Sequence, residues 1–103
     1  MSDAVVMLRP QPAMVVSRLR KINKGALVGF FDLEITGWRL GLHDCTWFCK
    51  DDREWIGLPS VKVTTKEGNA IWKKIVEFTD RQADARFQAA ALEAVRLFDR
   101  QGA

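Results

Sequence analysis

The residues whose types could carry chemistry stand close together in the middle of the chain: His43, Asp44, Cys45 and Cys49. A histidine, a carboxylate and thiols at this spacing raise two possibilities, thiol catalysis and metal binding. On a β-strand, residues two apart are separated by roughly 6.5–7 Å, and Cys45 from Cys49 by about 13 Å. A disulfide needs Cα atoms within about 7 Å. Zinc usually takes four close ligands, whereas the chain holds 1 histidine and 2 cysteines. We therefore expect packed free thiols, no metal, no cofactor and a structural His43–Asp44 hydrogen bond.

Two further carboxylates, Asp32 and Glu34, share one face of a predicted strand. Paired acids can run acid–base chemistry. Such pairs are more often solvated, or they face basic residues of the next strand, here Arg18 and Arg20. The sequence has no glycine-rich phosphate loop, nucleophile elbow or HExxH motif. We therefore predict that the protein is not an enzyme and has no small-molecule substrate.

Basic residues outnumber acidic residues only in the first half of the chain, and this local excess accounts for the net charge of +3. Four of these cations are close neighbours: Arg18, Arg20, Lys21 and Lys24. On one strand and its turn they would form a ridge about 20 Å long, at roughly 3.3 Å per residue. A local basic patch is what a polyanion requires. Charge alone equally fits a solvated edge that blocks aggregation.

The tryptophans offer a second binding signal. Trp38 adjoins Arg39, and Trp72 precedes Lys73 and Lys74. Aromatic side chains interleaved with cations are typical of proteins that stack bases along a backbone-tracking groove. For Trp47 and Trp55 we favour a role in the core, whereas Trp38 and Trp72 fit core and binding roles equally.

The elements that position these residues are strands with alternating apolar and polar side chains. The predicted strands cover residues 14–22, 26–36, 40–49, 55–58, 61–65 and 70–78. Their connections are too short for helices, so the sheet is antiparallel. The fold class is therefore α+β, with an antiparallel sheet of five or six strands followed by one C-terminal helix.

Residues 40–60 are the predicted centre of this sheet, a hairpin with a charged loop over residues 50–54 and a stop at Pro59. Strict alternation places Leu40, Leu42, Thr46 and Phe48 on one face and His43, Cys45, Trp47 and Cys49 on the other. In the first strand it places Val16, Arg18 and Arg20 on one face and Val15, Ser17, Leu19 and Lys21 on the other.

The C-terminal segment has helical spacing. Thr79 is the predicted N-cap, with Gln82 reaching back to it as a capping box. The apolar stripe consists of Ala83, Phe87, Ala90, Ala91, Ala94 and Phe98, widened by Leu92, Val95 and Leu97. This stripe is broader than one small sheet covers, so a second subunit is expected to cover the rest, in a homodimer.

The domain organisation is simple. Residues 15–103 are predicted to form a single domain, preceded by a flexible extension over residues 1–14 that holds two prolines. No run approaches the roughly 20 apolar residues of a membrane span. The N-terminus makes a poor secretory signal, and unpaired cysteines suit a reducing compartment. We expect a cytoplasmic location without membrane contact.

Several short motifs together resemble the stage V sporulation protein G (SpoVG, septation regulator) family. They are Leu42-His43-Asp44-Cys45, Gly57-Leu58-Pro59-Ser60, Glu67-Gly68 and, in the helix, Ala85-Arg86 followed by Leu92. The resemblance covers residues 18–98. The chain departs from the family in its N-terminal extension, in Val61 directly after Pro-Ser, and in residues 76–78, where the family has His-Pro.

The resemblance implies a small cytoplasmic dimer, bacterial or phage, that binds DNA or RNA and acts in transcription regulation or septation. The residues we expect to contact nucleic acid are Arg18, Arg20, Lys21, Lys24, Lys62, Trp72, Lys73, Lys74, Arg81 and Arg86. Two alternatives stay open: a single-stranded DNA-binding protein of the transcriptional-coactivator type, and a non-catalytic protein-interaction module.

Overall fold

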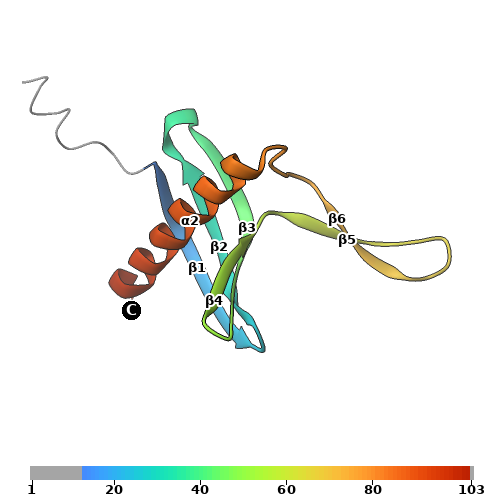
Figure 1. The fold of residues 1–103 in the computed structure, drawn as a ribbon. Coiled ribbons are helices and arrows are strands. Elements are labelled where there is room, and N and C mark those ends of the chain that lie inside the picture. The colour runs from blue at the N-terminus through green and yellow to red at the C-terminus, as the bar shows by residue number, and fades with distance from the viewer. Residues whose placement is uncertain (1–12, 103) are drawn as a thin grey trace, which may run out of the picture.

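A computed structural model describes residues 13–102 as two antiparallel sheets and a C-terminal helix (Figure 1). The strands are β1 (Met14–Lys24), β2 (Leu27–Ile35), β3 (Leu40–Lys50), β4 (Arg53–Gly57), β5 (Ser60–Thr64) and β6 (Ala70–Lys74). A 3-10 turn, η1 (Thr36–Trp38), joins β2 to β3, and the helix is α2 (Arg81–Gly102). The predicted α+β class, with six antiparallel strands followed by one helix, is confirmed for this part of the chain.

The main sheet has the order β1-β2-β3-β4, and α2 lies across one of its faces (Figure 1). We call this the helix face and the opposite side the open face. The buried core lies between sheet and helix, and its residues are Val16, Phe31, Leu33, Leu42, Cys45, Trp47, Ile56, Phe87, Ala91 and Val95. Three residues of the helix stripe are buried against the chain's own sheet, whereas Leu97 remains 44% exposed.

Register shifts interrupt the pairing of β1, β2 and β3, and two of them decide which side chains near Val16 and Leu42 reach each face. In β1, Val16 pairs with Leu33 but Arg18 pairs with Asp32, so Ser17 is an extra residue. Val16 therefore points into the core while Arg18 lies on the open face. Strict alternation, which placed Val16 and Arg18 together, is wrong here.

The second bulge is in β3. Leu42 pairs with Leu33 and Cys45 with Phe31, so two residues of β3 stand opposite Asp32 alone. The second of them, Asp44, has a φ of 61°, a left-handed conformation that aspartate tolerates. The bulge turns Leu42 and Cys45 to the same buried side, which corrects the alternation predicted for this strand.

The β3–β4 hairpin is tighter than predicted. Its turn consists of Asp51 and Asp52, whose φ values are 53° and 66°. Positive φ at both central residues belongs to a type I′ turn, whose twist matches that of the strands it joins. The ladder continues to the pair Lys50–Arg53, so the predicted loop over residues 50–54 is largely strand.

Helix α2 is capped and anchored by polar side chains. The Asp80 carboxylate accepts a hydrogen bond from the Ala83 N–H at 2.9 Å, so Asp80 is the N-cap and the predicted Thr79–Gln82 capping box is wrong. Gln88 then bonds both the N–H and the carbonyl of Ile56 at 2.8 Å. It occupies outward-facing backbone groups of the edge strand β4, as a fifth strand would.

Glu54 forms a second anchor between sheet and helix. It accepts hydrogen bonds from the Trp47 indole N–H, at 2.9 Å, and from Arg96 of α2. The Arg96 hydrogen bond, more than that of Trp47, lowers the pKa of the Glu54 carboxyl. The anchor therefore stays charged, and stabilises the fold, until the pH falls into the acidic range where that carboxyl takes up a proton.

Strands β5 and β6 leave the main body as a projecting hairpin, which we call the arm (Figure 1). Their ladder runs from Ser60–Lys74 at the base to Thr64–Ala70 near the tip. The predicted strand over residues 70–78 is too long, because β6 ends at Lys74 and the chain then returns to the body, where Phe78 packs on Phe87 with ring centroids 5.0 Å apart.

At the other end of the chain, Met14 already belongs to β1 and Thr36 donates its backbone N–H to the Ala13 carbonyl at 3.0 Å. The sheet therefore starts within the predicted extension over residues 1–14. The rest of that extension, residues 1–12, lies outside the described residues.

Candidate nucleic-acid interface

The open face of the main sheet carries a row of aromatic side chains. Phe30 lies on β2 opposite Thr46, and Phe48 on β3 stacks on Trp55 of β4, with ring centroids 5.2 Å apart and planes 14° apart. Trp55 is 38% exposed, so it is not the core residue we expected, whereas Trp47 on the helix face is buried as predicted. The face that α2 leaves uncovered therefore carries aromatic side chains on β2, β3 and β4.

Cations flank this aromatic row. The Arg20 guanidinium lies over the Phe30 ring, 5.6 Å from its centroid. Lys50 and Arg53 form the last pair of the β3–β4 ladder, two residues from Phe48 and Trp55 and hence on the same face. The rings of the open face therefore have Arg20 on one side and the Lys50–Arg53 pair on the other.

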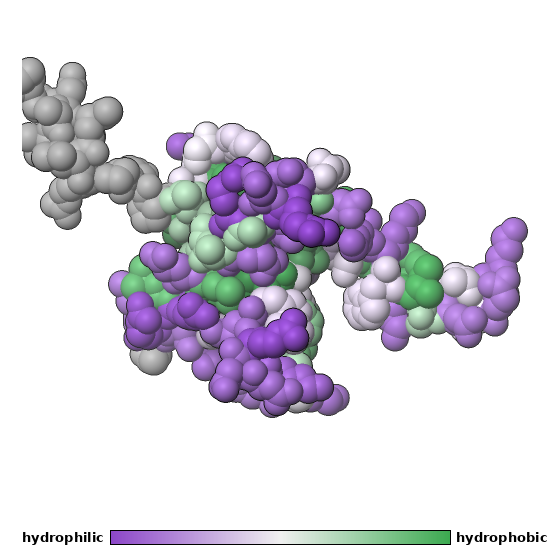
Figure 2. Space-filling view, viewed as in Figure 1, coloured by the Kyte–Doolittle hydropathy of each residue, from purple (hydrophilic) through white to green (hydrophobic). Residues whose placement is uncertain are grey.

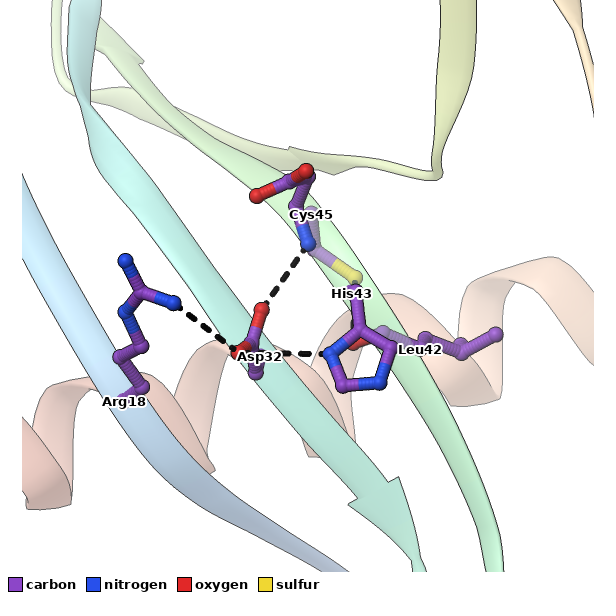
Figure 3. Close-up of polar contacts among 6 residues, drawn as sticks. Arg18, Asp32, Leu42, His43 and Cys45 are labelled. Carbon is purple, nitrogen blue, oxygen red and sulfur yellow. Dashed lines mark hydrogen bonds and ion pairs between the residues drawn. The ribbon is translucent and has the colours of Figure 1, made fainter.

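Asp32 organises the β1 side of this face (Figure 3). Its carboxylate accepts the Asp44 N–H at 3.0 Å and lies 3.3 Å from His43 Nδ1 and 4.0 Å from the Arg18 guanidinium. The backbone hydrogen bond from Asp44, more than the two side chains, lowers the Asp32 pKa. The expected pairing of Asp32 with Arg18 is confirmed. The predicted His43–Asp44 pair is wrong, because the bulge turns His43 toward Asp32.

A hollow of about 660 Å³ separates the open face from the arm. The sheet contributes Arg20, Phe30, Asp44, Thr46 and Phe48, among others, and the arm contributes Ser60 and Trp72. Trp72 is 69% exposed. An exposed indole therefore stands across the hollow from two rings of the sheet.

The predicted basic ridge on β1 is divided between the two faces. Lys21 turns to the helix face, where its ammonium lies 3.2 Å from Asp99 of α2 and 5.9 Å from the centre of the Trp47 ring. Arg18 and Arg20 remain on the open face. Lys24 lies at the exposed end of β1, so the four cations do not form one continuous ridge.

The predicted arm residues also divide. Lys62 pairs with Trp72, and Ser60 with Lys74, so Lys62, Trp72 and Lys74 share the side of the arm that borders the hollow. We call this the inner side. Lys73 pairs with Val61 on the other, outer side. Strand alternation therefore separates Lys73 from the two lysines beside Trp72.

Arg81 and Arg86 are exposed in the first turns of α2. Since α2 covers the face opposite Arg18 and Arg20, the structure does not bring the helix arginines together with the open-face cations.

The interface contains residues that the sequence analysis did not select: Phe30, Phe48, Trp55, Lys50 and Arg53. The available signal is the period of two in β2, which puts Phe30 on the same face as Asp32. The stacked Phe48–Trp55 pair depends on the hairpin register, which a two-residue turn sets and a five-residue loop would not.

The cysteines lie apart from this surface chemistry. Cys45 is buried and Cys49 exposed, and both are free. Burial, more than the nearby Asp32 and Asp44 charges, raises the pKa of the Cys45 thiol to about 12. Within residues 13–102, no group of three or more histidine, cysteine or acidic side chains is arranged to hold a metal ion, and no helix has the length and apolarity to cross a membrane.

The chain matches no protein-family model, no curated protein and no solved structure. The candidate function therefore depends on the geometry of the open face and on the motifs of the sequence.

Proposed function

We propose that this protein binds single-stranded nucleic acid on the open face of its main sheet and the inner side of its arm, as a regulator without catalytic activity. The observation that carries the proposal is the row of Phe30, Phe48 and Trp55 on the face that α2 leaves uncovered, with Arg20, Lys50 and Arg53 beside it. Rings stack bases, and the cations between them neutralise phosphates.

A single strand suits this surface better than a duplex does. A base can stack on a protein side chain only when it is unpaired. A base in a duplex would first have to leave the duplex to reach these rings. The aromatic row lies on a sheet, and the helix lies on the opposite face, so no helix of the described chain is presented for a major groove at this site. The sequence motifs shared with the SpoVG family support a nucleic-acid regulator as the protein class.

The experiment compares two exposed tryptophans. Trp72 borders the hollow. Trp38 is 74% exposed but lies in η1, the connection between β2 and β3, and does not line the hollow. Trp72→Ala is expected to weaken binding of a labelled oligothymidine by about 10-fold, from the roughly 1–3 kcal/mol of one stacked base, and duplex binding by much less. Fluorescence anisotropy measures both.

Trp38→Ala is the matched control and is expected to leave both affinities unchanged. Equal losses for the two variants, or a larger loss for the duplex, would refute stacking at the hollow.

We also propose that the protein is a homodimer and that its copies meet through the outer side of the arm rather than through α2. The outer side carries Val61, Val63 and Ile71, and Val61 and Ile71 are 43% and 48% exposed. Figure 2 shows a hydrophobic patch partway along the arm, set apart from the body. A two-stranded hairpin is marginally stable alone, so a partner surface that buries these side chains also stabilises the arm.

Charge complementarity favours a second copy as that partner. Glu67 lies in the turn at the arm tip, and Lys73 lies beside Val61 near the base, on the outer side. When two arms pack antiparallel about a twofold axis, the tip of each arm reaches the base of the other. Glu67 of each copy then lies near Lys73 of the other copy, which gives two symmetric ion pairs. The inner sides then stay free for nucleic acid.

A further inference from the structure

Two opposite charges line the hollow without neutralising each other. Arg20 and Asp44 both border it. Among the described residues, no hydrogen bond or ion pair engages the Asp44 carboxylate, although its backbone N–H is bonded to Asp32. A free carboxylate on a surface of rings and cations repels phosphate. Its placement suits a ligand group that donates hydrogen bonds better than it suits the phosphate backbone.

The Asp44 side chain starts from a fixed position. The β3 bulge sets its φ at 61°, and its N–H donates to Asp32 at 3.0 Å. Asp32 is itself held by His43 and Arg18. Ligand binding therefore does not have to order the backbone that carries this carboxylate, which lowers the entropic cost of using it.

Arg20 is positioned by a ring. Its guanidinium lies 5.6 Å from the centroid of Phe30, and it presents five N–H donors and no acceptor. Asp44, when ionised, presents acceptors only. The hollow thus combines a donor-only group and an acceptor-only group beside rings that can stack a base. Its volume of about 660 Å³ falls in the range of roughly 300–1,000 Å³ of small-ligand sites.

Among the common bases, guanine has two neighbouring edges that match these groups. Its O6 and N7 are paired acceptors, the usual target of arginine. Its N1–H and N2 amino group are paired donors that fit one carboxylate. Adenine and cytosine each offer one amino group beside a ring acceptor, which a carboxylate repels, and thymine has one N–H between two carbonyls. A carboxylate therefore favours guanine over the other three.

We infer that the hollow is a guanine-selective base site, with Asp44 accepting from the Watson–Crick edge, Arg20 donating to O6 and N7, and Trp72 covering the stacked base. The inference rests on the proposed function, since it names the base that the single strand places in the hollow. Phe30 and Phe48 line the hollow on the side of the sheet.

The test uses the full chain and thymine oligonucleotides that carry one central guanine, hypoxanthine, adenine or cytosine. By anisotropy, the guanine strand is expected to bind about 10-fold tighter than the all-thymine strand, as one bidentate contact gives. Hypoxanthine lacks the N2 amino group, so its strand is expected to lose most of that advantage.

Asp44→Asn keeps a residue type that tolerates the left-handed backbone and is expected to reduce the guanine preference to less than about 3-fold, with thymine binding unchanged or tighter. Asp52→Asn is the matched control, because Asp52 is also exposed with a positive φ but lies in the β3–β4 turn. This control is expected to keep the full preference.

The outcomes separate the two proposals. Equal binding of all strands by the wild-type protein, or a guanine preference that survives Asp44→Asn, overturns the guanine site and leaves single-strand binding standing. Absence of binding to every strand overturns the proposed function, and the guanine site with it.

Discussion

Replacing Arg18 and Arg20 together by glutamate is expected to weaken single-strand binding about 100-fold or more at low salt. Both side chains lie on the open face, Arg18 beside Asp32 and Arg20 over Phe30. The two reversals remove two cations from the open face and add two repulsive charges. Each phosphate lost is also expected to flatten the dependence of log affinity on log salt by about 0.7 for a single strand. Anisotropy at several salt concentrations measures both quantities.

The control is a second double charge reversal, which changes the net charge by the same amount but lies on the helix side of the molecule. Arg81 and Arg86 are exposed at the start of α2, where glutamate is compatible with the helix dipole. The double reversal Arg81→Glu with Arg86→Glu is expected to cost a few-fold in affinity and to keep the salt slope. If both double variants lose affinity equally, net charge rather than the open face governs binding.

Replacing Ile71 by aspartate is expected to leave the protein monomeric at micromolar concentrations, where the wild-type chain is expected to dimerise. Ile71 lies opposite Val63 at the middle of the outer side of the arm. In the antiparallel arrangement two new carboxylates would meet near the twofold axis, in place of a buried apolar contact, and we expect a dissociation constant at least about 100-fold higher. Analytical ultracentrifugation measures it.

Leu97→Asp is the matched control, since Leu97 is 44% exposed on α2 and lies outside the arm. It is expected to keep the dimer. A wild-type chain that sediments only as an 11.7 kDa species at these concentrations contradicts the homodimer. A dimer lost in Leu97→Asp and kept in Ile71→Asp places the contact on the helix.

The fold class could be predicted because period-two alternation and a single helical stretch dominate the sequence. The faces could not, because a bulge adds one residue without any change in composition. Ser17 in β1 and the His43–Asp44 pair in β3 each shift the alternation, which separates Val16 from Arg18 and joins Leu42 to Cys45. Strict alternation is therefore wrong for pairs of residues that a bulge separates, and it is right for Arg18 with Arg20 and for Thr46 with Phe48.

The interface could be predicted only in part for a related reason. Arg18, Arg20 and Trp72 were selected from local composition, and all three border the open face or the hollow. Lys21 was selected on the same grounds, but its ammonium meets Asp99, a residue 78 positions away. Such a long-range ion pair leaves no local signal. The two strands of the arm, in contrast, could be predicted from the turn residues around Gly68, whose φ is 88°.

The most direct test of binding on the open face is a titration of ¹⁵N-labelled protein with a short oligothymidine, followed by amide chemical shifts. We expect saturable shifts at Phe30, Thr46 and Phe48, which line the hollow, and at Trp72 across it, with little change at Ala91 and Val95 beneath α2. The duplex of the same sequence is expected to produce smaller shifts. Shifts confined to α2, or no shifts with either ligand, would contradict the account.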